Sequence, residues 1–193
     1  ASTIFMGKTS VPNDGLWDQN LDWLNITKSK ETLVISKSKI YRSGGFIVLK
    51  KGIATAVMIL PTNHFRPPQA DALHLDFWID GDPLFSDAGS YSYNCDPDTY
   101  DYFNSVEGHN TVQFDDRDQM PKLKRFLYGN WNTTNHIDEI DETPSKISSE
   151  ASYTDYLGAT HKRRIELTNH KIRVIDNVSG FSSKASLRWR LSQ

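Results

Sequence analysis

The sequence of 193 residues contains a single cysteine, Cys95, so the chain cannot form a disulfide bond within itself. The fold must therefore be stabilised by packing and strand pairing, although this absence alone does not place the protein in the cytoplasm. Long hydrophobic runs are also missing. The longest run, 53–60, has the length of a β-strand, whereas a membrane-spanning helix needs about 20 apolar residues. We therefore expect no membrane span.

The chain also lacks a basic stripe, and its net charge is −2. Nucleic-acid-binding domains carry clustered Lys and Arg, so nucleic acid is not an expected partner. The first residues, 1–4, show no basic segment followed by an apolar one, as a signal peptide would. The strand-like segment 187–191 stops abruptly at the other end. We expect the chain to be a fragment of a longer protein.

Helical periodicity is scarce, and 17–24 is the best candidate for a short helix. Strand signals dominate the rest, because short β-branched or alternating segments are separated by polar turns. The clearest alternation runs over 73–79 and is followed by the turn residues of 80–82. We expect strands at 32–36, 45–49, 53–60, 73–79, 84–85, 111–114, 147–154, 159–167, 172–178 and 186–191.

This pattern is typical of an all-β protein, an antiparallel β-sandwich. We expect one sandwich domain over 1–193, with 1–30 as an irregular lead-in and 139–146 as a solvated turn. Aromatic residues make up 11% of the chain. They suit both a sandwich core and sugar stacking, and the core is the expected place for most of them.

Three segments place polar residues beside strongly β-patterned chain, namely 66–74, 84–93 and 108–119. Each has a simple structural explanation when taken alone. Asp87 can end a strand by bonding local amides, His109 can be hydrogen-bonded in a loop, and Asp71 can be a buried carboxylate. Their chemistry is therefore judged from the three segments together.

Together, Asp71-Ala72-Leu73, Asp87-x-Gly89-x-Tyr91 and His109-Asn110-Thr111-Val112 resemble the heparinase II/III family of polysaccharide lyases, which includes related alginate lyases. The segments 160–165, 174–177 and 187–189 are also similar to that family's sandwich. The resemblance covers about residues 50 to 193.

The resemblance implies a supersandwich-like C-terminal domain, normally preceded by an α/α toroid that is absent here. It also implies β-elimination in a uronic-acid-containing polysaccharide. A base removes the C5 proton of the uronate, an acid protonates the leaving oxygen, and a third group neutralises the carboxylate. The implied partners are an acidic polysaccharide and the toroid, and the implied location is periplasmic or secreted, in bacteria. Without its toroid such a domain is an incomplete enzyme.

The family's metal site implies Gln69, Asp87 and His109 as ligands here. The family has His-x-His before the aspartate, whereas this chain has Pro67 and Gln69. The loss of imidazole leaves three outcomes open: a structural zinc, a harder ion such as calcium with waters, or no metal at all. In the last case the three side chains form a hydrogen-bond cluster that joins three strands.

Tyr91 is the expected catalytic residue of the sandwich, and its alternative is a core aromatic with its hydroxyl tied to the backbone. His64 is the candidate to replace the lost histidine. Arg66, His161 and Arg163 are expected to contact the anionic sugar, although such residues also pair with Asp or Glu. We expect Gln69, Asp87 and His109 to converge next to the Tyr91 hydroxyl.

Two other functions stay open. A non-catalytic carbohydrate-binding or scaffold module would explain the lost histidines and the many Trp and Tyr residues. A purely structural sandwich is a weaker alternative, because the Cys…Trp…Cys pattern of immunoglobulin domains is missing.

Overall fold

The computed structural model describes residues 8–9, 14–32, 37–62, 65–125, 127–169 and 171–192, with the side chain of Trp17 left out. The chain divides into two compact units, 1–37 and 38–193. In the described part of the chain, no helix is both long and apolar enough to cross a membrane.

The first unit contains a short helical segment, made of η1 (Leu16–Asp18) and α2 (Gln19–Trp23). This segment overlaps the region 17–24, where the sequence predicts a helix. Its buried side chain is Leu21, and Lys28 Nζ lies 2.8 Å from the Asp18 carboxylate. A parallel bridge joins Thr9 to Thr32. The rest of the strand predicted at 32–36 lies outside the described residues.

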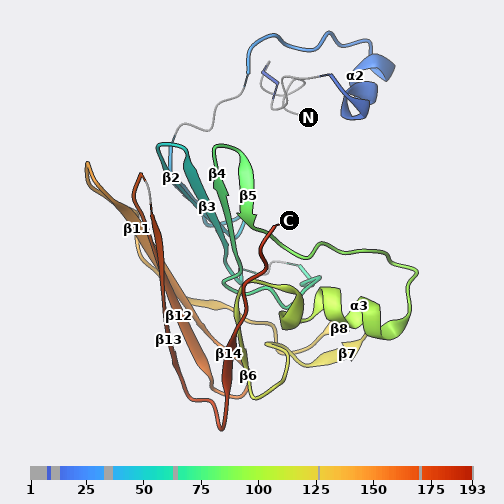
Figure 1. Ribbon diagram of the computed structural model, residues 1–193. Coiled ribbons are helices and arrows are strands. Elements are labelled where there is room, and N and C mark those ends of the chain that lie inside the picture. The colour runs from blue at the N-terminus through green and yellow to red at the C-terminus, as the bar shows by residue number, and fades with distance from the viewer. Residues whose placement is uncertain are drawn as a thin grey trace. The chain divides into compact units, whose positions relative to one another are not determined.

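The second unit begins with an antiparallel sheet in which chain order and spatial order coincide, β1-β2-β3-β4-β5 (Figure 1). Its strands are β1 (Lys39–Tyr41), β2 (Phe46–Lys51), β3 (Ala54–Ile59), β4 (Leu75–Ile79) and β5 (Asp82–Phe85). Alternate residues of β3 and β4 are buried, as the period of two in a strand requires.

A second five-stranded sheet is built around β11 (Ile147–Thr154), β12 (Thr160–Leu167) and β13 (Ile172–Ser179). Both β9 (Thr134–Ile137) and β10 (Asp141–Glu142) pair with β11. The predicted solvated turn at 139–146 is therefore partly wrong, because β10 continues the sheet before the turn.

Apolar side chains of the two sheets form one core, to which β2 contributes Ile47 and Leu49 and β12 contributes Ile165 and Leu167. Sheets that share a core in this way form a sandwich. The all-β antiparallel β-sandwich predicted from the sequence is confirmed.

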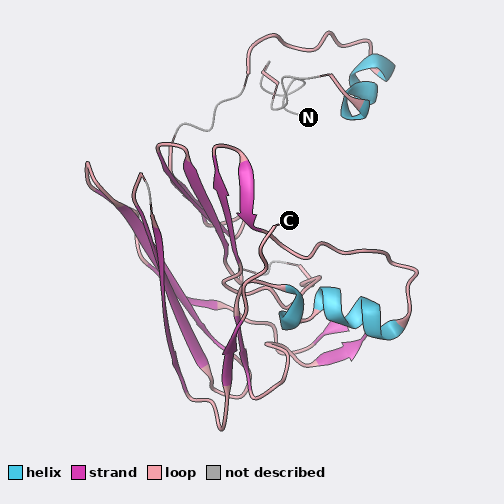
Figure 2. Cartoon of the chain, in the orientation of Figure 1, coloured by secondary structure: helices cyan, strands magenta, loops and turns pink. Residues whose placement is uncertain are grey.

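Smaller elements extend the sandwich: β6 (Val112–Phe114) pairs with β14 (Ala185–Leu187), and β7 (Lys122–Lys124) with β8 (Leu127–Tyr128). Figure 2 shows helix α3 (Pro97–Asn104) near the β7–β8 hairpin. The sequence analysis missed this helix, although Asp96 caps it by accepting the Thr99 amide and Pro97 stands in its first turn. A short η2 (Val106–Gly108) follows.

Candidate functional site

The site is organised by a tight turn that leads into β4. The His74 amide donates a hydrogen bond to the Asp71 carbonyl at 2.9 Å, which closes the turn. Leu73 has a φ of 57° and is fully buried. A non-glycine residue in this left-handed region costs about 1–3 kcal/mol and persists only where its surroundings fix it.

Buried polar side chains supply that fixation. Gln119 binds both backbone polar groups of Ala72. Its Oε1 accepts the Ala72 amide at 2.9 Å, and its Nε2 donates to the Ala72 carbonyl at 3.1 Å. Thr111 donates its hydroxyl to the same carbonyl at 2.7 Å. Arg163 donates Nη1 to the Leu73 carbonyl at 2.7 Å. Three side chains therefore fix the turn, and the turn sets the direction of the next side chain, that of His74.

His74 meets two of the residues predicted from the sequence. His109 Nδ1 lies 2.6 Å from Asp87 Oδ2, and His74 Nε2 lies 4.0 Å from the same oxygen. The ligand atoms of these three side chains all lie within 4.8 Å of one another. Both imidazoles are fully buried. His74, Asp87 and His109, here called the imidazole cluster, therefore form a possible metal-binding triad.

The hydrogen bonds of His74 limit what it can contribute to a metal. Its Nδ1 accepts the Asn110 backbone amide at 2.9 Å, so that nitrogen carries no proton. In the neutral ring the proton is then on Nε2, which lies 2.9 Å from the Asp76 carboxylate. His74 can become a ligand only by exchanging one of these bonds, and in this arrangement it orients the cluster.

Asp87 and His109 are better suited to bind a metal. A metal shared between them would take the place of the proton in their hydrogen bond. Asp87 and His109 together supply two ligands, whereas a structural zinc site has four. They fit an ion that keeps water or other oxygen ligands.

The charge of the cluster is set by its carboxylates. Burial is the largest single influence on Asp87 and favours its neutral acid. The hydrogen bond from His109, the electrostatic attraction of that ring and the Gly89 amide together outweigh burial and hold the pKa of Asp87 below its ordinary value. Burial raises the pKa of nearby Asp71, and the imidazoles of His109 and His74 offset this only in part. The Asp87 carboxylate of the cluster is therefore ionised.

Arg163 and His161 lie on β12 and share a second carboxylate, that of Asp176. Both are fully buried on the inward face of β12. The Asp176 carboxylate accepts hydrogen bonds from Arg163 Nε at 2.7 Å and Nη2 at 3.1 Å, and it lies 2.7 Å from His161 Nε2. These facts favour a structural role for both side chains over the sugar contact predicted from the sequence.

The role of Arg163 is visible in its remaining contacts. Besides the Leu73 carbonyl, its Nη1 binds the Asn110 carbonyl at 2.6 Å. Leu73 precedes His74 and Asn110 follows His109 along the chain. A single guanidinium therefore fixes the backbone next to both imidazoles of the cluster, a contact that the sequence analysis missed.

Tyr91 lies on the long segment between β5 and α3. Its side chain is 74% exposed and its ring stacks on Phe103, with centroids 5.5 Å apart. The alternative of a core aromatic is therefore wrong. Gln69 donates Nε2 to the Phe103 carbonyl at 3.4 Å, so Phe103 contacts both predicted residues.

A cavity of about 370 Å³ lies in the same region and is lined by Arg66, Gln69, Ser90, Tyr93, Tyr100 and Asn104. Arg66 is exposed, so its guanidinium is accessible to an anionic ligand. His64, the other predicted catalytic residue, lies outside the described residues.

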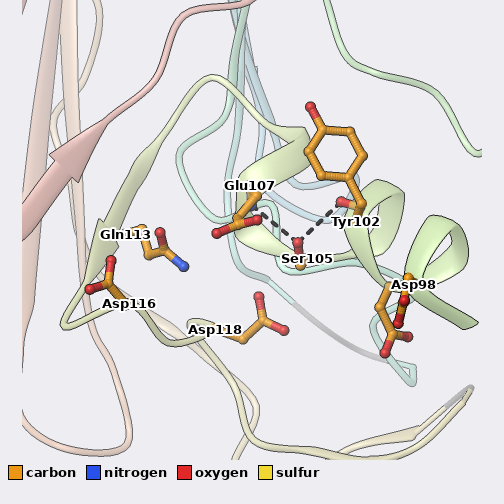
Figure 3. A pocket seen from close by; sticks show the side chains of 8 residues that line it. Asp98, Tyr102, Ser105, Glu107, Gln113, Asp116 and Asp118 are labelled. Carbon is orange, nitrogen blue, oxygen red and sulfur yellow. Dashed lines mark hydrogen bonds between the residues drawn. The ribbon is translucent and has the colours of Figure 1, made fainter.

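A separate cavity of about 320 Å³ has the opposite charge (Figure 3). Its lining includes Asp98, Glu107, Asp116 and Asp118. Burial raises the pKa of Asp118, and the negative charge of Glu107 adds to this shift. An anionic ligand would be repelled here, whereas the Arg66 cavity offers it a positive charge.

Known proteins resemble this chain in sequence and in fold. The family model described as Heparinase II/III-like, C-terminal, matches residues 36–193. No curated protein sequence matches the chain. The structure of a heparinase III gene product superimposes with a TM-score of 0.66 at 20% identity, covering 91% of this chain and 27% of that chain.

Heparan sulfate lyase HepC from Pedobacter heparinus gives a TM-score of 0.63 at 17% identity, with 91% of this chain and 27% of that chain covered. A further heparinase III structure gives 0.61 at 18% identity, covering 92% and 30%. The chain thus spans less than a third of each of these structures. It belongs to the heparinase II/III-like family and corresponds to the C-terminal domain of that family.

Proposed function

We propose that this chain is the sandwich part of a lyase that cleaves a uronic-acid-containing polysaccharide by β-elimination. The observation that carries the proposal is Tyr91, which is exposed and stacked on Phe103, in one of the segments that together resemble the family. Arg66 and Gln69 line a cavity in the same region. A phenol in such a place can reach a bound sugar.

In this proposal Tyr91 exchanges a proton with the reacting sugar. A phenol suits this role when its surroundings tune its pKa toward the working pH. Arg66 pairs with the uronate carboxylate, and neutralising that carboxylate makes the C5 proton more acidic. The remaining acid–base groups come from the α/α toroid that the family resemblance implies, so we propose that the domain alone is inactive.

We further propose that Asp87 and His109 hold a metal ion whose coordination is completed by water. The ion would add a fixed positive charge behind the segment that carries Tyr91. His74 supports the site by its bonds to Asn110 and Asp76. We place the protein in the periplasm or outside the cell, where acidic polysaccharides are found.

The test uses a protein in which this chain is joined to its toroid. Elimination is measured as the absorbance of the unsaturated uronate produced from heparan sulfate or alginate. Tyr91→Phe keeps the ring and its stacking but removes the hydroxyl, and we expect at least a roughly hundredfold loss of kcat. Tyr41→Phe, at an exposed position on β1, is the matched control. Equal activity of wild type and Tyr91→Phe would exclude the catalytic role.

A non-catalytic carbohydrate-binding module is the second candidate, because Pro67 and Gln69 stand where the family has histidines. This alternative predicts tight binding of an acidic polysaccharide with no elimination even when the toroid is present. Calorimetric titration together with the absorbance assay distinguishes the two functions.

A further inference from the structure

The β7–β8 hairpin carries a concentration of positive charge that the proposed site does not use. A cavity of about 500 Å³ lies against this hairpin, and Tyr100, Lys122, Leu123, Lys124 and Arg125 are among its lining residues. Asp101 is the acidic residue of the lining. Lys122 forms a close ion pair with Asp101. The lining thus holds three basic residues and one acidic residue.

The guanidinium of Arg125 is held in place before any ligand arrives. It lies 4.7 Å from the centroid of the Tyr100 ring, a distance typical of a cation–π contact. Its Nη2 donates to the Tyr93 carbonyl at 2.5 Å and to the Cys95 carbonyl at 3.4 Å. A preorganised cation loses little side-chain entropy when it binds an anion.

The hairpin cavity also adjoins the proposed sugar site. Tyr100 lines both the hairpin cavity and the Arg66 cavity. Arg125 binds the carbonyl of Tyr93, which lines the Arg66 cavity and lies two residues after Tyr91. A polysaccharide bound at Arg66 would therefore pass close to the hairpin.

The surroundings of the hairpin cavity suit a sugar bearing an anionic group. Leu123 is 60% exposed and offers an apolar surface to the carbon face of a ring. Lys124 is exposed, so its ammonium can move toward the anion. The acidic cavity of Figure 3 shares Asp101 with this one, so the side chain of Asp101 separates a basic region from an acidic one.

We propose that the β7–β8 hairpin is a second anionic subsite, in which Lys124 and Arg125 bind a sulfate or carboxylate of a sugar near the one held at Arg66. This inference rests on the proposed function and adds where the substrate's other charges are recognised. Charge-assisted hydrogen bonds to sulfate or carboxylate are the interactions involved.

The test measures the affinity of this chain for heparan sulfate and for alginate, which carries carboxylates without sulfates, by calorimetric titration. We expect Lys124→Gln to weaken binding roughly five- to tenfold at low salt, as the loss of one charge-assisted hydrogen bond predicts. Arg173→Gln removes an equally exposed charge from β13 and should leave affinity unchanged. Lys124→Arg should restore wild-type affinity.

The two polysaccharides separate the possible ligands. A loss confined to heparan sulfate identifies sulfate as the group bound, and an equal loss with both identifies carboxylate. Wild-type affinity of Lys124→Gln for both would overturn the hairpin subsite while leaving the proposed function intact. Absence of binding of both polysaccharides to the wild type would also overturn the subsite, whereas the proposed function is tested separately by the elimination assay of the toroid-joined protein.

Discussion

Two carboxylates of this protein each have two basic neighbours, but only one has a permanent cation among them. Asp176 is bound by Arg163 and His161. Asp87 is bound by His109 and lies 4.0 Å from His74. A guanidinium stays charged at every relevant pH, whereas an imidazole does not. Arg163 therefore neutralises the charge of Asp176, and we call this group of residues the complete centre. Both basic neighbours of Asp87 are imidazoles, so this second group, the incomplete centre, can accept a further positive charge.

Exposure follows the same division. The side chain of Asp176 is 13% exposed and that of Asp87 is 31% exposed. Each centre leaves one buried imidazole nitrogen without a hydrogen-bond partner among the described residues, Nδ1 of His161 and Nε2 of His109. An unpartnered imidazole therefore does not distinguish a ligand site from a structural one. The two centres differ in the permanent charge of Arg163, which lies beside Asp176.

The largest effect should come from breaking the complete centre. Arg163→Met leaves the Asp176 carboxylate buried without its main partner, and we expect the free energy of unfolding to fall by about 3–5 kcal/mol. Arg164→Met is the matched control, because Arg164 is the next residue on β12 and is partly exposed. It should cost less than about 1 kcal/mol in urea denaturation. Similar losses for both variants would contradict a special role for Arg163.

The second prediction concerns the incomplete centre. A divalent metal present at about 100 times its Kd should stabilise the wild type by about 2.7 kcal/mol. His109→Ala should abolish this gain. His74→Gln should reduce the metal affinity without eliminating it, because His74 acts through its bonds to Asn110 and Asp76. Thermal unfolding with and without Zn²⁺, Mn²⁺ or Ca²⁺ measures both, and equal stabilisation of all three proteins would contradict the site.

The third prediction uses pH to separate the partners of Asp176. Burial opposes ionisation of Asp176, but its bonds to His161 and Arg163 lower its pKa from 3.8 to about 2. This shift contributes roughly 2 kcal/mol that is fully present above pH about 4 and is lost as the pH falls through 2. Burial lowers the pKa of His161, and the Asp176 bond only partly offsets it. The stability that depends on a neutral His161 is therefore lost first, as the pH falls below 6.5, the ordinary pKa of the imidazole.

Measuring the free energy of unfolding from pH 7 downward, in roughly half-unit steps, should therefore show two windows of loss. His161→Gln should remove the upper window and leave the lower one in place. A single transition in the wild type, unaffected by this variant, would contradict the assignment.

The smallest effect is expected at Asp76. Because Nδ1 of His74 accepts the Asn110 amide, the ring proton is on Nε2, and the amide oxygen of an Asn at position 76 can accept this hydrogen bond in place of the carboxylate. Asp76→Asn should then change stability by less than about 1 kcal/mol. A much larger loss would show that the negative charge of Asp76, and not only its hydrogen-bond acceptor, is needed beside His74. Nitrogen-15 NMR of the imidazole reports the tautomer directly.

Part of this difference between the centres could be predicted from the sequence. On β12, Ile165 and Leu167 face the core, and a period of two places Arg163 and His161 on the same face. Their burial was therefore implied by alternation, although the sequence analysis assigned them to sugar contact. The alternation over 73–79 likewise predicted β4, but it could not show that His74 is buried, because the turn before the strand sets its direction.

The sequence by itself determined the longer strands of the two sheets, the sandwich and the family, since these depend on local alternation, turn residues and short ordered motifs. Only the tertiary structure decided which groups surround each carboxylate. The Asn110 amide binds His74 across 36 positions of the chain, and Arg163 binds Leu73 across 90. Contacts over such separations leave no periodic trace in a sequence, so the division into a complete and an incomplete charge centre emerges only when the two sheets meet.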